Sequence, residues 1–378
     1  MLFTIAIILL LLVYALRMLF FYSGVKRELK RNIPIIRSGY EPFVSIVVPA
    51  RNEEVAIEDC IISISQNDYP VDKYEIIAVN DRSEDETGKR LEKLKGSIPN
   101  LIVIHNNRTN PVQNLQGKPG ALQLAITHCH GEIILMTDAD CIVGKKWISS
   151  HAACFCDSSL GITAAYTDIM GKNPFSCIQA IEWIYLHSLA VGAIGWDHPL
   201  SCYGNNISLS KEKYDLIGGY KSLKFSITED LAMLHAMHKR HFSTRHLSDP
   251  DSEIRTLANT KMKDYIRQHH RWIVGGASGL GIDAFLFVCT TIAIWSAIIV
   301  SALSGQWIMF AISFLARIIL DQSAIIPPIF RLRRKDLLPW ILPATIFMMC
   351  FELIAPLFLI KCDVKWKGQT FENLRRKD

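Results

Sequence analysis

The chain lacks the two glycine-rich loops that most often bind nucleotides. No Gly-x-Gly-x-x-Gly follows the first predicted strand, which disfavours a dinucleotide-binding fold, and no Gly-Lys-Ser/Thr loop is present, which argues against a nucleoside triphosphatase. The ten cysteines show no spacing typical of a disulfide framework. Cys154 and Cys156 could bind a metal, but no second pair of cysteines follows at the spacing of a zinc site. We therefore expect reduced, packed cysteines rather than disulfides or a zinc site.

The chain also lacks a large excess of charge of either sign. The net charge is only +5, and the basic residues gather near hydrophobic segments. This distribution predicts contact with anionic lipid headgroups and no binding of nucleic acid. The first hydrophobic segment has no basic region before it and no small-residue cleavage site after it, so we expect an anchor rather than a signal peptide.

Four hydrophobic segments, at residues 2–23, 284–304, 307–330 and 337–360, have about the 20 residues that a helix needs to cross a bilayer. The stretch between the first two has ordinary globular composition. We therefore predict an integral membrane protein, in the cell inner membrane, with one inserted soluble domain. The predicted parts are a transmembrane helix (1–24), a soluble α/β domain (25–261), an interfacial amphipathic helix (262–282), C-terminal transmembrane segments (283–360) and a basic tail (361–378).

Basic clusters predict the orientation of these segments. The cluster at residues 26–31 follows the first segment and places the N-terminus outside and the soluble domain in the cytoplasm, and the cluster at 331–335 then also lies inside. Pro339, Pro343 and Pro356 predict a kinked or re-entrant last segment. The side of the membrane on which the tail lies stays open.

Apolar runs alternate with helix patterns in the first half of the soluble domain. This alternation predicts a mainly parallel sheet with crossover helices, in which ligands bind beyond the carboxyl ends of the strands. Polar residues follow three of these ends, at 50–53, 80–83 and 138–140. The strands are expected at 43–48, 75–79, 101–105 and 132–136, and the helices at 54–65, 85–95 and 118–128.

Asp138 and Asp140 stand two residues apart just beyond the fourth predicted strand. Two carboxylates this close repel each other, and a divalent cation that also binds phosphate would relieve the repulsion. An acidic turn is the alternative interpretation, because such turns are common.

Six ordered motifs closely resemble the family-2 glycosyltransferases, which have the Rossmann-like GT-A fold for nucleotide sugars. The resemblance covers about residues 42–275, and the last two motifs are typical of a subgroup with ceramide glucosyltransferase-like enzymes and the cellulose, hyaluronan and poly-N-acetylglucosamine synthases. The motifs are VPARNEE (48–54), VNDRSEDET (79–87), GKPGAL (117–122), TDAD (137–140), TED (228–230) and QHHRW (268–272).

The resemblance implies a role for each matching position. Asp138 and Asp140 would hold Mg²⁺ or Mn²⁺ against the diphosphate of a nucleotide sugar, expected to be a UDP-sugar. The donor-binding residues would be Pro49, Asn52, Glu53, Asp81, Lys118, Asp138, Gln268, Arg271 and Trp272. For Asn52 and Glu53, helix capping is the alternative role, and Lys118 could equally be a solvated lysine that opens a helix.

Asp230 would be the general base, and its neighbour Glu229 would raise its pKa because like charges repel. Acceptor contacts are expected from Asn205, Glu229 and Trp272. A structural alternative is that Thr228 caps a helix whose first turn holds both acids. Gln268, Arg271 and Trp272 share one face of an amphipathic helix that we expect at the membrane interface.

Three functions remain open at this stage. The first is an inverting transfer of one sugar to a membrane lipid at the cytoplasmic face. The second is a processive polysaccharide synthase, which would also need a channel for its polymer. The third is a non-catalytic nucleotide-binding scaffold, and the intact acidic motifs argue against it. No oligomeric state is predicted.

Overall fold

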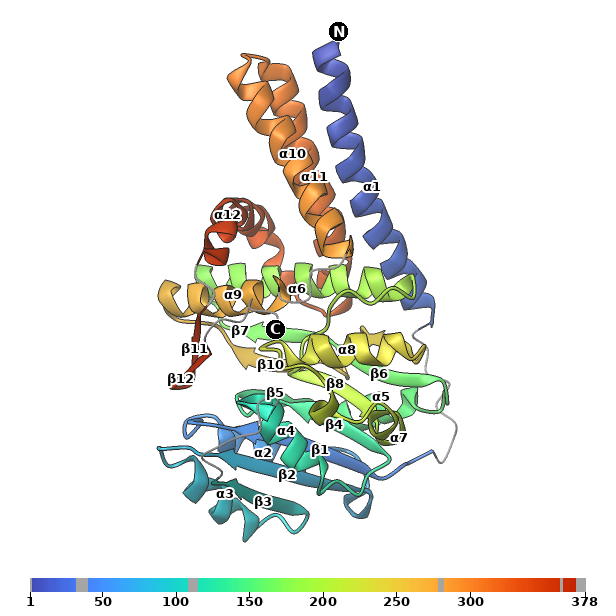
Figure 1. Ribbon diagram of the computed structural model, residues 1–378, viewed down its shortest axis with the longest axis vertical. Helices are drawn as coiled ribbons and strands as arrows, with labels where there is room; N and C mark the ends of the chain where they lie inside the picture. Colours follow the sequence, from blue (N-terminus) through green and yellow to red (C-terminus); the bar gives the residue numbers. More distant parts are fainter. Residues whose placement is uncertain (1, 32–39, 108–114, 278–281, 361–362, 372–378) are drawn as a thin grey trace.

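The computed structural model describes residues 2–31, 40–107, 115–277, 282–360 and 363–371. Figure 1 shows three tiers: a sheet domain, a layer of helices that lie crosswise above it, and three long helices that rise from that layer. The sheet domain belongs to the α/β class, and the long helices are apolar, so the predicted combination of an α/β domain with apolar helices is confirmed.

The main sheet has seven strands in the order β3-β2-β1-β4-β8-β6-β9. Strands β3, β2, β1 and β4 run parallel to one another, and β6 runs parallel to β9. Strand β8, between β4 and β6, runs antiparallel to both. The sheet is therefore mainly parallel, as predicted, with one reversed strand. The strands are β1 (Val44–Ala50), β2 (Tyr74–Asp81), β3 (Leu101–Asn106), β4 (Ile133–Thr137), β6 (Leu160–Ala165), β8 (Asn206–Ser210) and β9 (Ser243–Leu247).

Successive side chains of the central strands pack on opposite faces of the sheet. On β1, Ile46 and Val48 belong to the core under α2, α3 and α5, whereas Val47 belongs to the core under α4 and α8. Both faces are buried, which explains why these strands are continuous apolar runs. The covering helices are α2 (Ile57–Ser65), α3 (Thr87–Lys95), α4 (Lys118–Ile126), α5 (Trp147–Cys154), α7 (Lys211–Leu216) and α8 (Glu229–Lys239), with short 3₁₀ turns at Val71–Lys73 and Tyr220–Ser222.

A second sheet connects the main sheet to the helix layer. It contains β5 (Cys141–Val143), β10 (Ile254–Leu257) and β7 (Thr167–Met170), in that order. All four strands and three helices predicted for residues 43–136 are present, with ends that differ by at most three residues.

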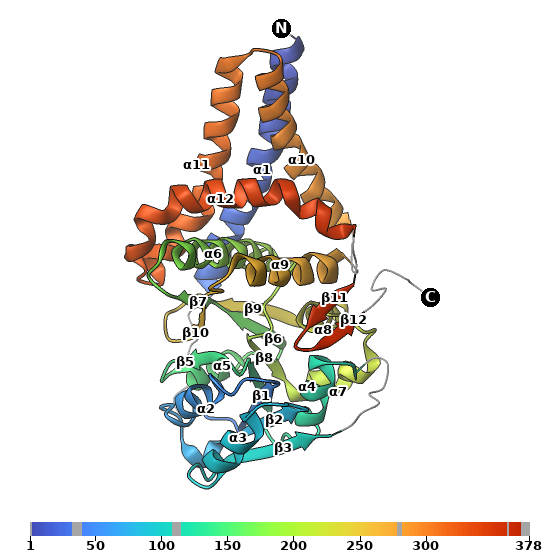
Figure 2. The same ribbon diagram turned by 90° about the vertical axis from the view of Figure 1, so that its left-hand side faces the viewer.

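The crosswise layer consists of α6 (Pro174–Gly195), α9 (Met262–Ala277) and α12 (Ile341–Ile354) (Figures 1 and 2). Helix α6 is buried over most of its length and contacts α1, α11 and α12. At its crossing with α1 a Cβ on Gly192 would lie 2.5 Å from the Phe21 carbonyl oxygen, so only glycine allows this approach. Helix α9 covers the predicted interfacial segment up to Ala277; residues 278–281 lie outside the described part.

The long helices α1 (Leu2–Arg31), α10 (Ile282–Leu303) and α11 (Trp307–Arg331) run side by side away from the sheet domain. Among the residues that the structure describes, five helical segments could cross a membrane by length and composition: these three, α6, and residues 335–359. Apolar side chains on the outer face of α1, such as Leu9, Leu12 and Leu16, are exposed. A bilayer would cover them.

The last hydrophobic segment does not run alongside the long helices. It is divided into a 3₁₀ turn (Lys335–Trp340), α12 and a second 3₁₀ turn (Ala355–Leu359), and α12 lies crosswise in both views. Pro339 lies in the first 3₁₀ turn, Pro343 near the start of α12, and Pro356 in the second. These breaks agree with the expectation of a kinked or re-entrant last segment, and the assignment of 283–360 to transmembrane segments stays a prediction.

The segment assigned to a basic tail is partly folded. Strands β11 (Val364–Trp366) and β12 (Gln369–Phe371) pair as an antiparallel hairpin on the same side of the helix layer as the main sheet. The sequence interpretation missed this hairpin, and its tip reaches the site described below.

Candidate functional site

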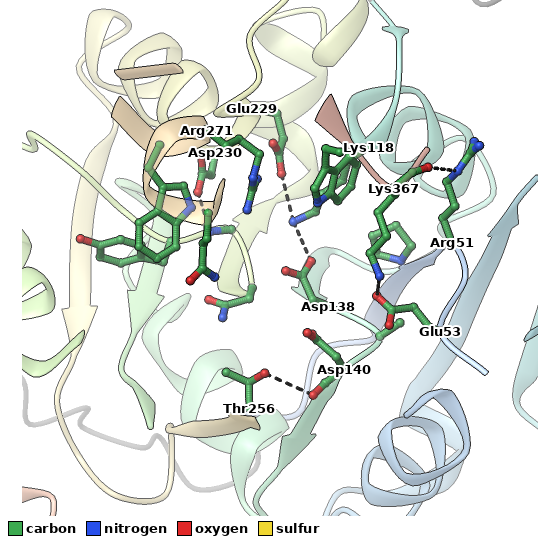
Figure 3. Close-up of a pocket in the computed structure, with 18 of the residues that line it drawn as sticks. Arg51, Glu53, Lys118, Asp138, Asp140, Glu229, Asp230, Thr256, Arg271 and Lys367 are labelled. Atoms are coloured by element: carbon green, nitrogen blue, oxygen red, sulfur yellow. Dashed lines mark hydrogen bonds and ion pairs between the residues drawn. The ribbon is translucent and has the colours of Figure 1, made fainter. Parts of the chain in front are cut away.

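A cavity of about 240 Å³ lies where the carboxyl ends of β1, β2 and β4 meet α6 and α9 (Figure 3). The sheet topology accounts for its position, because parallel strands leave their loops at one edge. Twelve of the thirteen predicted site residues line it: Pro49, Glu53, Asp81, Lys118, Asp138, Asp140, Asn205, Glu229, Asp230, Gln268, Arg271 and Trp272.

Asn52 is the exception, since it does not line the cavity. It has a left-handed backbone (φ 52°), which Asn tolerates better than most residues. Its Oδ1 accepts a hydrogen bond from the Glu84 N–H (2.9 Å), and its own N–H donates to Ser83 Oγ (3.0 Å). Asn52 thus ties together the loops after β1 and β2, and the expected nucleoside contact by its side chain is not supported.

Asp81 ends β2 with its carboxylate almost fully buried. The Arg82 guanidinium donates to both carboxylate oxygens, at 2.9 and 3.0 Å, and Asn106 Nδ2 donates to Oδ1 at 2.7 Å. These partners fix the carboxylate at the rim of the cavity.

Asp138 and Asp140 follow the buried strand β4 and face the cavity (Figure 3). Asp138 Oδ1 pairs with Lys118 Nζ at 2.6 Å. The Asp140 side chain is exposed to the cavity. Its partial desolvation there, followed by the charge of Asp138, raises its pKa. Two adjacent carboxylates that face one cavity are a chemically suitable site for a divalent cation.

No group of three or more His, Cys, Asp or Glu side chains suited to a metal occurs within the described residues. A cation at the Asp138–Asp140 pair would therefore take its other ligands from substrate and water. Phosphate oxygens suit this need, because Mg²⁺ is often bound by one or two carboxylates plus substrate phosphates.

Lys118 connects the two acidic groups of the cavity. Its Nζ lies 2.6 Å from Asp138 Oδ1 and 3.0 Å from Glu229 Oε1, and only 14% of its side chain is exposed. The neighbouring carboxylates raise its pKa against the effect of burial, so it stays a cation. The alternative of a solvated lysine is wrong.

Asp230 lies in the first turn of α8, directly after Glu229. Its Oδ2 accepts from the Gly204 N–H (2.7 Å) and its Oδ1 from the Leu231 N–H (2.8 Å). Burial, followed by the charge of Glu229, raises the pKa of Asp230 to about 6. A carboxylate with such a pKa is suited to general-base catalysis near neutral pH.

Thr228 occupies the N-cap position of α8 but makes no capping hydrogen bond with its side chain. Its Oγ1 pairs with Ser226 Oγ at 3.1 Å instead. The capping alternative therefore explains the place of the two acids on the helix, but it does not explain why both line a cavity.

Helix α9 supplies Gln268, Arg271 and Trp272 from one face. The Trp272 ring packs edge-on against Trp183 of α6 (5.4 Å between centroids), and Trp183 packs against Tyr203 (5.3 Å). These three aromatic residues lie at the Asp230 end of the cavity, because Tyr203 adjoins Gly204, whose N–H donates to Asp230. Asn205, also at this end, accepts a hydrogen bond from Thr167 Oγ1 at 3.0 Å.

The C-terminal hairpin supplies site residues that the sequence interpretation missed. Lys367 Nζ lies 2.6 Å from Glu53 Oε1, and the Arg51 Nε donates to the Lys367 carbonyl at 3.0 Å (Figure 3). The guanidinium of Arg271 lies over the Trp366 ring at 5.5 Å. Burial raises the pKa of Glu53 to about 7 even though Lys367 opposes this shift.

A signal for the hairpin is present in the sequence. Lys367 and Gly368 have positive φ angles of 46° and 76°, as a two-residue hairpin turn requires. Val364, Trp366 and Phe371 flank this pair in a segment that is otherwise polar. Apolar residues on both sides of a turn pair are a hairpin pattern.

Comparison with known families decides the class of protein. The sequence model of the family described as "Glycosyl transferase family 2" matches residues 45–232. The chain belongs to this family. The predicted membership is thus confirmed, and the matched region contains the acidic residues of β2, β4 and α8 described above.

Some relatives of this family 2 glycosyltransferase have names that describe lipid glycosylation. It is 26% identical over 256 residues to a beta-monoglucosyldiacylglycerol synthase from Synechocystis sp., a match that covers 66% of this chain and 50% of the relative. It is 27% identical over 245 residues to the protein of that name from Trichormus variabilis, covering 63% and 50%. The chain spans about half the length of these relatives.

A solved structure shares the fold over nearly the whole chain. It is a mannosyltransferase from Pyrobaculum calidifontis in complex with GDP-Man and Mn²⁺, with a TM-score of 0.61 and 19% identity. The match covers 95% of this chain and 98% of that one. The likeness extends beyond the sheet domain to the helix layer and the long helices.

Proposed function

We propose that this glycosyltransferase moves one sugar, with inversion, from a UDP-sugar to the hydroxyl group of a membrane lipid at the cytoplasmic face. One observation carries this proposal. A single cavity holds a carboxylate pair suited to a cation and the half-buried carboxylate of Asp230, and it is lined by α6 and α9 of the helix layer, of which α6 packs on the long helices α1 and α11.

The donor end would bind the nucleotide diphosphate. Asp81 would accept a hydrogen bond from the base, and Arg271, Lys118 and Lys367 would bring positive charge to a diphosphate, since all four line the cavity. Asp138 and Asp140 would hold Mg²⁺ or Mn²⁺, which when bound supplies Lewis-acid stabilisation of the leaving diphosphate. The related fold that holds GDP-Man and Mn²⁺ supports this pairing of ligands.

The acceptor end would perform the proton transfer. Ionised Asp230 accepts the proton of the attacking hydroxyl while the sugar–phosphate bond breaks on the opposite face, so the configuration at the anomeric carbon inverts. Two backbone N–H groups hold the carboxylate in place. Trp272 and Trp183 would pack against the acceptor beside it.

The helix layer supports a lipid acceptor. Helices α6 and α9 both line the cavity, and α6 packs directly on α1 and α11. A lipid in the bilayer could therefore present its hydroxyl without leaving the membrane. The lipid named in the relatives' descriptions is a diacylglycerol, which has one free hydroxyl.

The basic residues support the cytoplasmic orientation. Arg31 at the end of α1 pairs with Asp197 (2.7 Å), and Arg334 after α11 pairs with Asp168. Both clusters therefore lie at the sheet-domain end of the long helices. The positive-inside rule then places the catalytic domain in the cytoplasm.

A polysaccharide synthase is the second candidate, and the helix packing disfavours it. Tyr14, Met18 and Ile294 are buried where α1, α10 and α11 meet α6, and Tyr14 donates a hydrogen bond to Asp321 of α11. Side chains therefore fill the space that a growing polymer would need between these helices.

The product identifies the function. Purified protein in vesicles with Mn²⁺ is given radiolabelled UDP-glucose, UDP-N-acetylglucosamine or GDP-mannose. We expect one discrete labelled product in the organic phase from a UDP-sugar. An ethanol-precipitable polymer would identify a synthase instead, and the absence of any donor turnover would support the scaffold.

A further inference from the structure

Three amide side chains form a chain of hydrogen bonds at the acceptor end of the cavity. They are Gln179 of α6, Asn259 between β10 and α9, and Gln268 of α9, and all three line the cavity. Gln179 and Asn259 are not part of any motif recognised in the sequence. Their contacts determine which atoms of Gln268 face the substrate.

Backbone carbonyl groups fix the orientation of the Gln179 amide, and with it the donor-to-acceptor order of these hydrogen bonds. Its Nε2 lies 3.0 Å from the Asn259 carbonyl oxygen and 3.3 Å from that of Phe175. Carbonyl oxygens only accept hydrogen bonds, so the nitrogen must point to them. Gln179 Oε1 consequently accepts, and the Asn259 backbone N–H donates to it at 2.9 Å.

The side chain of Asn259 in turn fixes the orientation of the Gln268 amide. Asn259 Nδ2 donates to Gln179 Oε1 at 3.3 Å and to Gln268 Oε1 at 2.9 Å. Turning the Asn259 amide around would bring its oxygen against the acceptor oxygen of Gln179. The oxygen of Gln268 is therefore occupied, and within the described part of the chain its Nε2 has no protein partner. The two N–H groups of Gln268 are left for a substrate oxygen.

The surrounding wall is uncharged. The cavity-lining residues of α6 and of the loop before β8, together with Asn259, carry no ionisable charge at neutral pH; they include Gln179, Trp183, Tyr203 and Asn205. Glu229 and Asp230 lie close by and would repel an anion. Of the cations that line the cavity, Lys118 is paired with two carboxylates, and Lys367 lies on the Asp138 side with Arg51 (Figure 3). The fourth, Arg271, shares a face of α9 with Gln268, but its guanidinium lies over the Trp366 ring of the hairpin, and we assign it above to the donor diphosphate.

We propose that Gln179 and Asn259 are positioning residues, which fix the amide of Gln268 so that it donates to an oxygen of an uncharged, hydroxyl-bearing lipid. This inference rests on the proposed function and narrows its acceptor class. It favours a neutral lipid over a lipid phosphate, because Lys118 and Lys367 are paired with carboxylates and Arg271 is assigned to the donor diphosphate.

The acceptor class is tested with three lipids. Vesicles of phosphatidylcholine are doped with dioleoylglycerol, ceramide or undecaprenyl phosphate, and labelled lipid is measured with the donor and Mn²⁺. We expect product from a neutral lipid and none from undecaprenyl phosphate. Product from undecaprenyl phosphate would overturn the neutral class and the hydroxyl acceptor, while leaving intact the transfer of a sugar from a nucleotide sugar to a membrane lipid. No product from any of the three would overturn the proposed function, and this inference with it.

The positioning role is tested by variants assayed with the lipid that is turned over. Gln268→Glu keeps the shape but removes both donors, and we expect kcat/KM for the lipid to fall about 10- to 100-fold. Asn259→Ala frees the Gln268 amide to rotate, and we expect the KM for the lipid to rise several-fold while kcat changes little. UDP affinity and the unfolding midpoint report whether either variant has changed the donor end or the fold.

The double variant distinguishes positioning from an independent contact. If Asn259 acts through Gln268, Asn259→Ala adds no further loss to Gln268→Glu. Multiplied losses in the double variant, or wild-type lipid kinetics in Asn259→Ala and Gln179→Leu, would overturn the positioning role. Gln66→Glu is the matched control, because Gln66 is exposed at the end of α2 and far along the chain from the three amides.

Discussion

The two ends of the cavity are built in different ways. Loops that follow β1, β2 and β4 form the donor end, so a few consecutive strand–helix units position Asp81, Asp138 and Asp140. The acceptor end is assembled from α6, α9 and the loop before β8, and the C-terminal hairpin joins the rim. Sheet topology alone fixes the first end, whereas the second depends on how helices pack at the membrane side.

This difference predicts separable defects. Changes at the donor end should remove nucleotide binding together with transfer. Changes at the acceptor end should spare nucleotide binding. Four experiments test this separation, and each uses the lipid and the sugar donor that the wild-type protein turns over.

The largest effect is expected at the carboxylate pair. Asp140→Asn removes half of the charge that would hold the cation, so transfer should fall by about 10³-fold and Mn²⁺-dependent UDP binding should be lost. EDTA should have the same effect on the wild type. Label transfer and isothermal titration with UDP measure the two results.

Asp215→Asn is the control for this change, because it removes an exposed carboxylate of α7 and should leave both quantities unchanged. Unchanged transfer in Asp140→Asn would contradict the metal site.

Trp272→Ala should separate the two ends. The ring packs against Trp183 at the acceptor end, so its loss should raise the KM for the lipid by about 10- to 100-fold. UDP affinity, measured in the same preparation, should stay at the wild-type value. A loss of UDP affinity with an unchanged lipid KM would instead assign Trp272 to the donor end.

The pH dependence should come from the acceptor end. Asp230 acts as a base only when ionised, and because its pKa is raised to about 6, kcat/KM should fall about tenfold per pH unit below that value. The charge of Glu229 contributes to the raised pKa of Asp230. Glu229→Gln should therefore shift the acidic limb of the pH–rate profile, where kcat/KM falls, to lower pH. A limb that does not move in Glu229→Gln would count against Asp230 as the titrating group.

The smallest effect is expected at the hairpin. Lys367→Ala removes a cation from the rim and leaves Glu53 without its partner, so the KM for the donor should rise about 3- to 10-fold. Donor kinetics measure this change. Lys365→Ala in the same hairpin is the matched control, because Lys365 is exposed and does not line the cavity. Equal effects of the two substitutions would indicate a general charge effect.

The donor end could be predicted from the sequence because its signals are local. Apolar runs of strand length end at Ala50, Asp81 and Thr137, and the polar residues that follow them come to one edge through the parallel topology. Even here Asn52 departs from expectation. Its side chain is used to hold the loop after β2, which the order of residues does not reveal.

The acceptor end could be predicted only in part. The helix face of Gln268, Arg271 and Trp272 follows from spacing, but the pairing of Gln268 with Asn259 and Gln179 joins residues up to 89 positions apart, from 179 to 268. Such contacts are set by the crossing of α6 and α9, for which a single sequence carries no pattern. The position of Lys367 against Glu53, from opposite ends of the chain, is missed for the same reason.

Asp230→Asn tests the central claim most directly. The change keeps the shape of the side chain at the second position of α8 but removes the base, while the donor end stays intact. Labelled lipid and UDP–Mn²⁺ affinity are measured on one vesicle preparation. The account predicts no labelled lipid above background with wild-type UDP affinity. Transfer at the wild-type rate, or loss of UDP binding together with transfer, would contradict it.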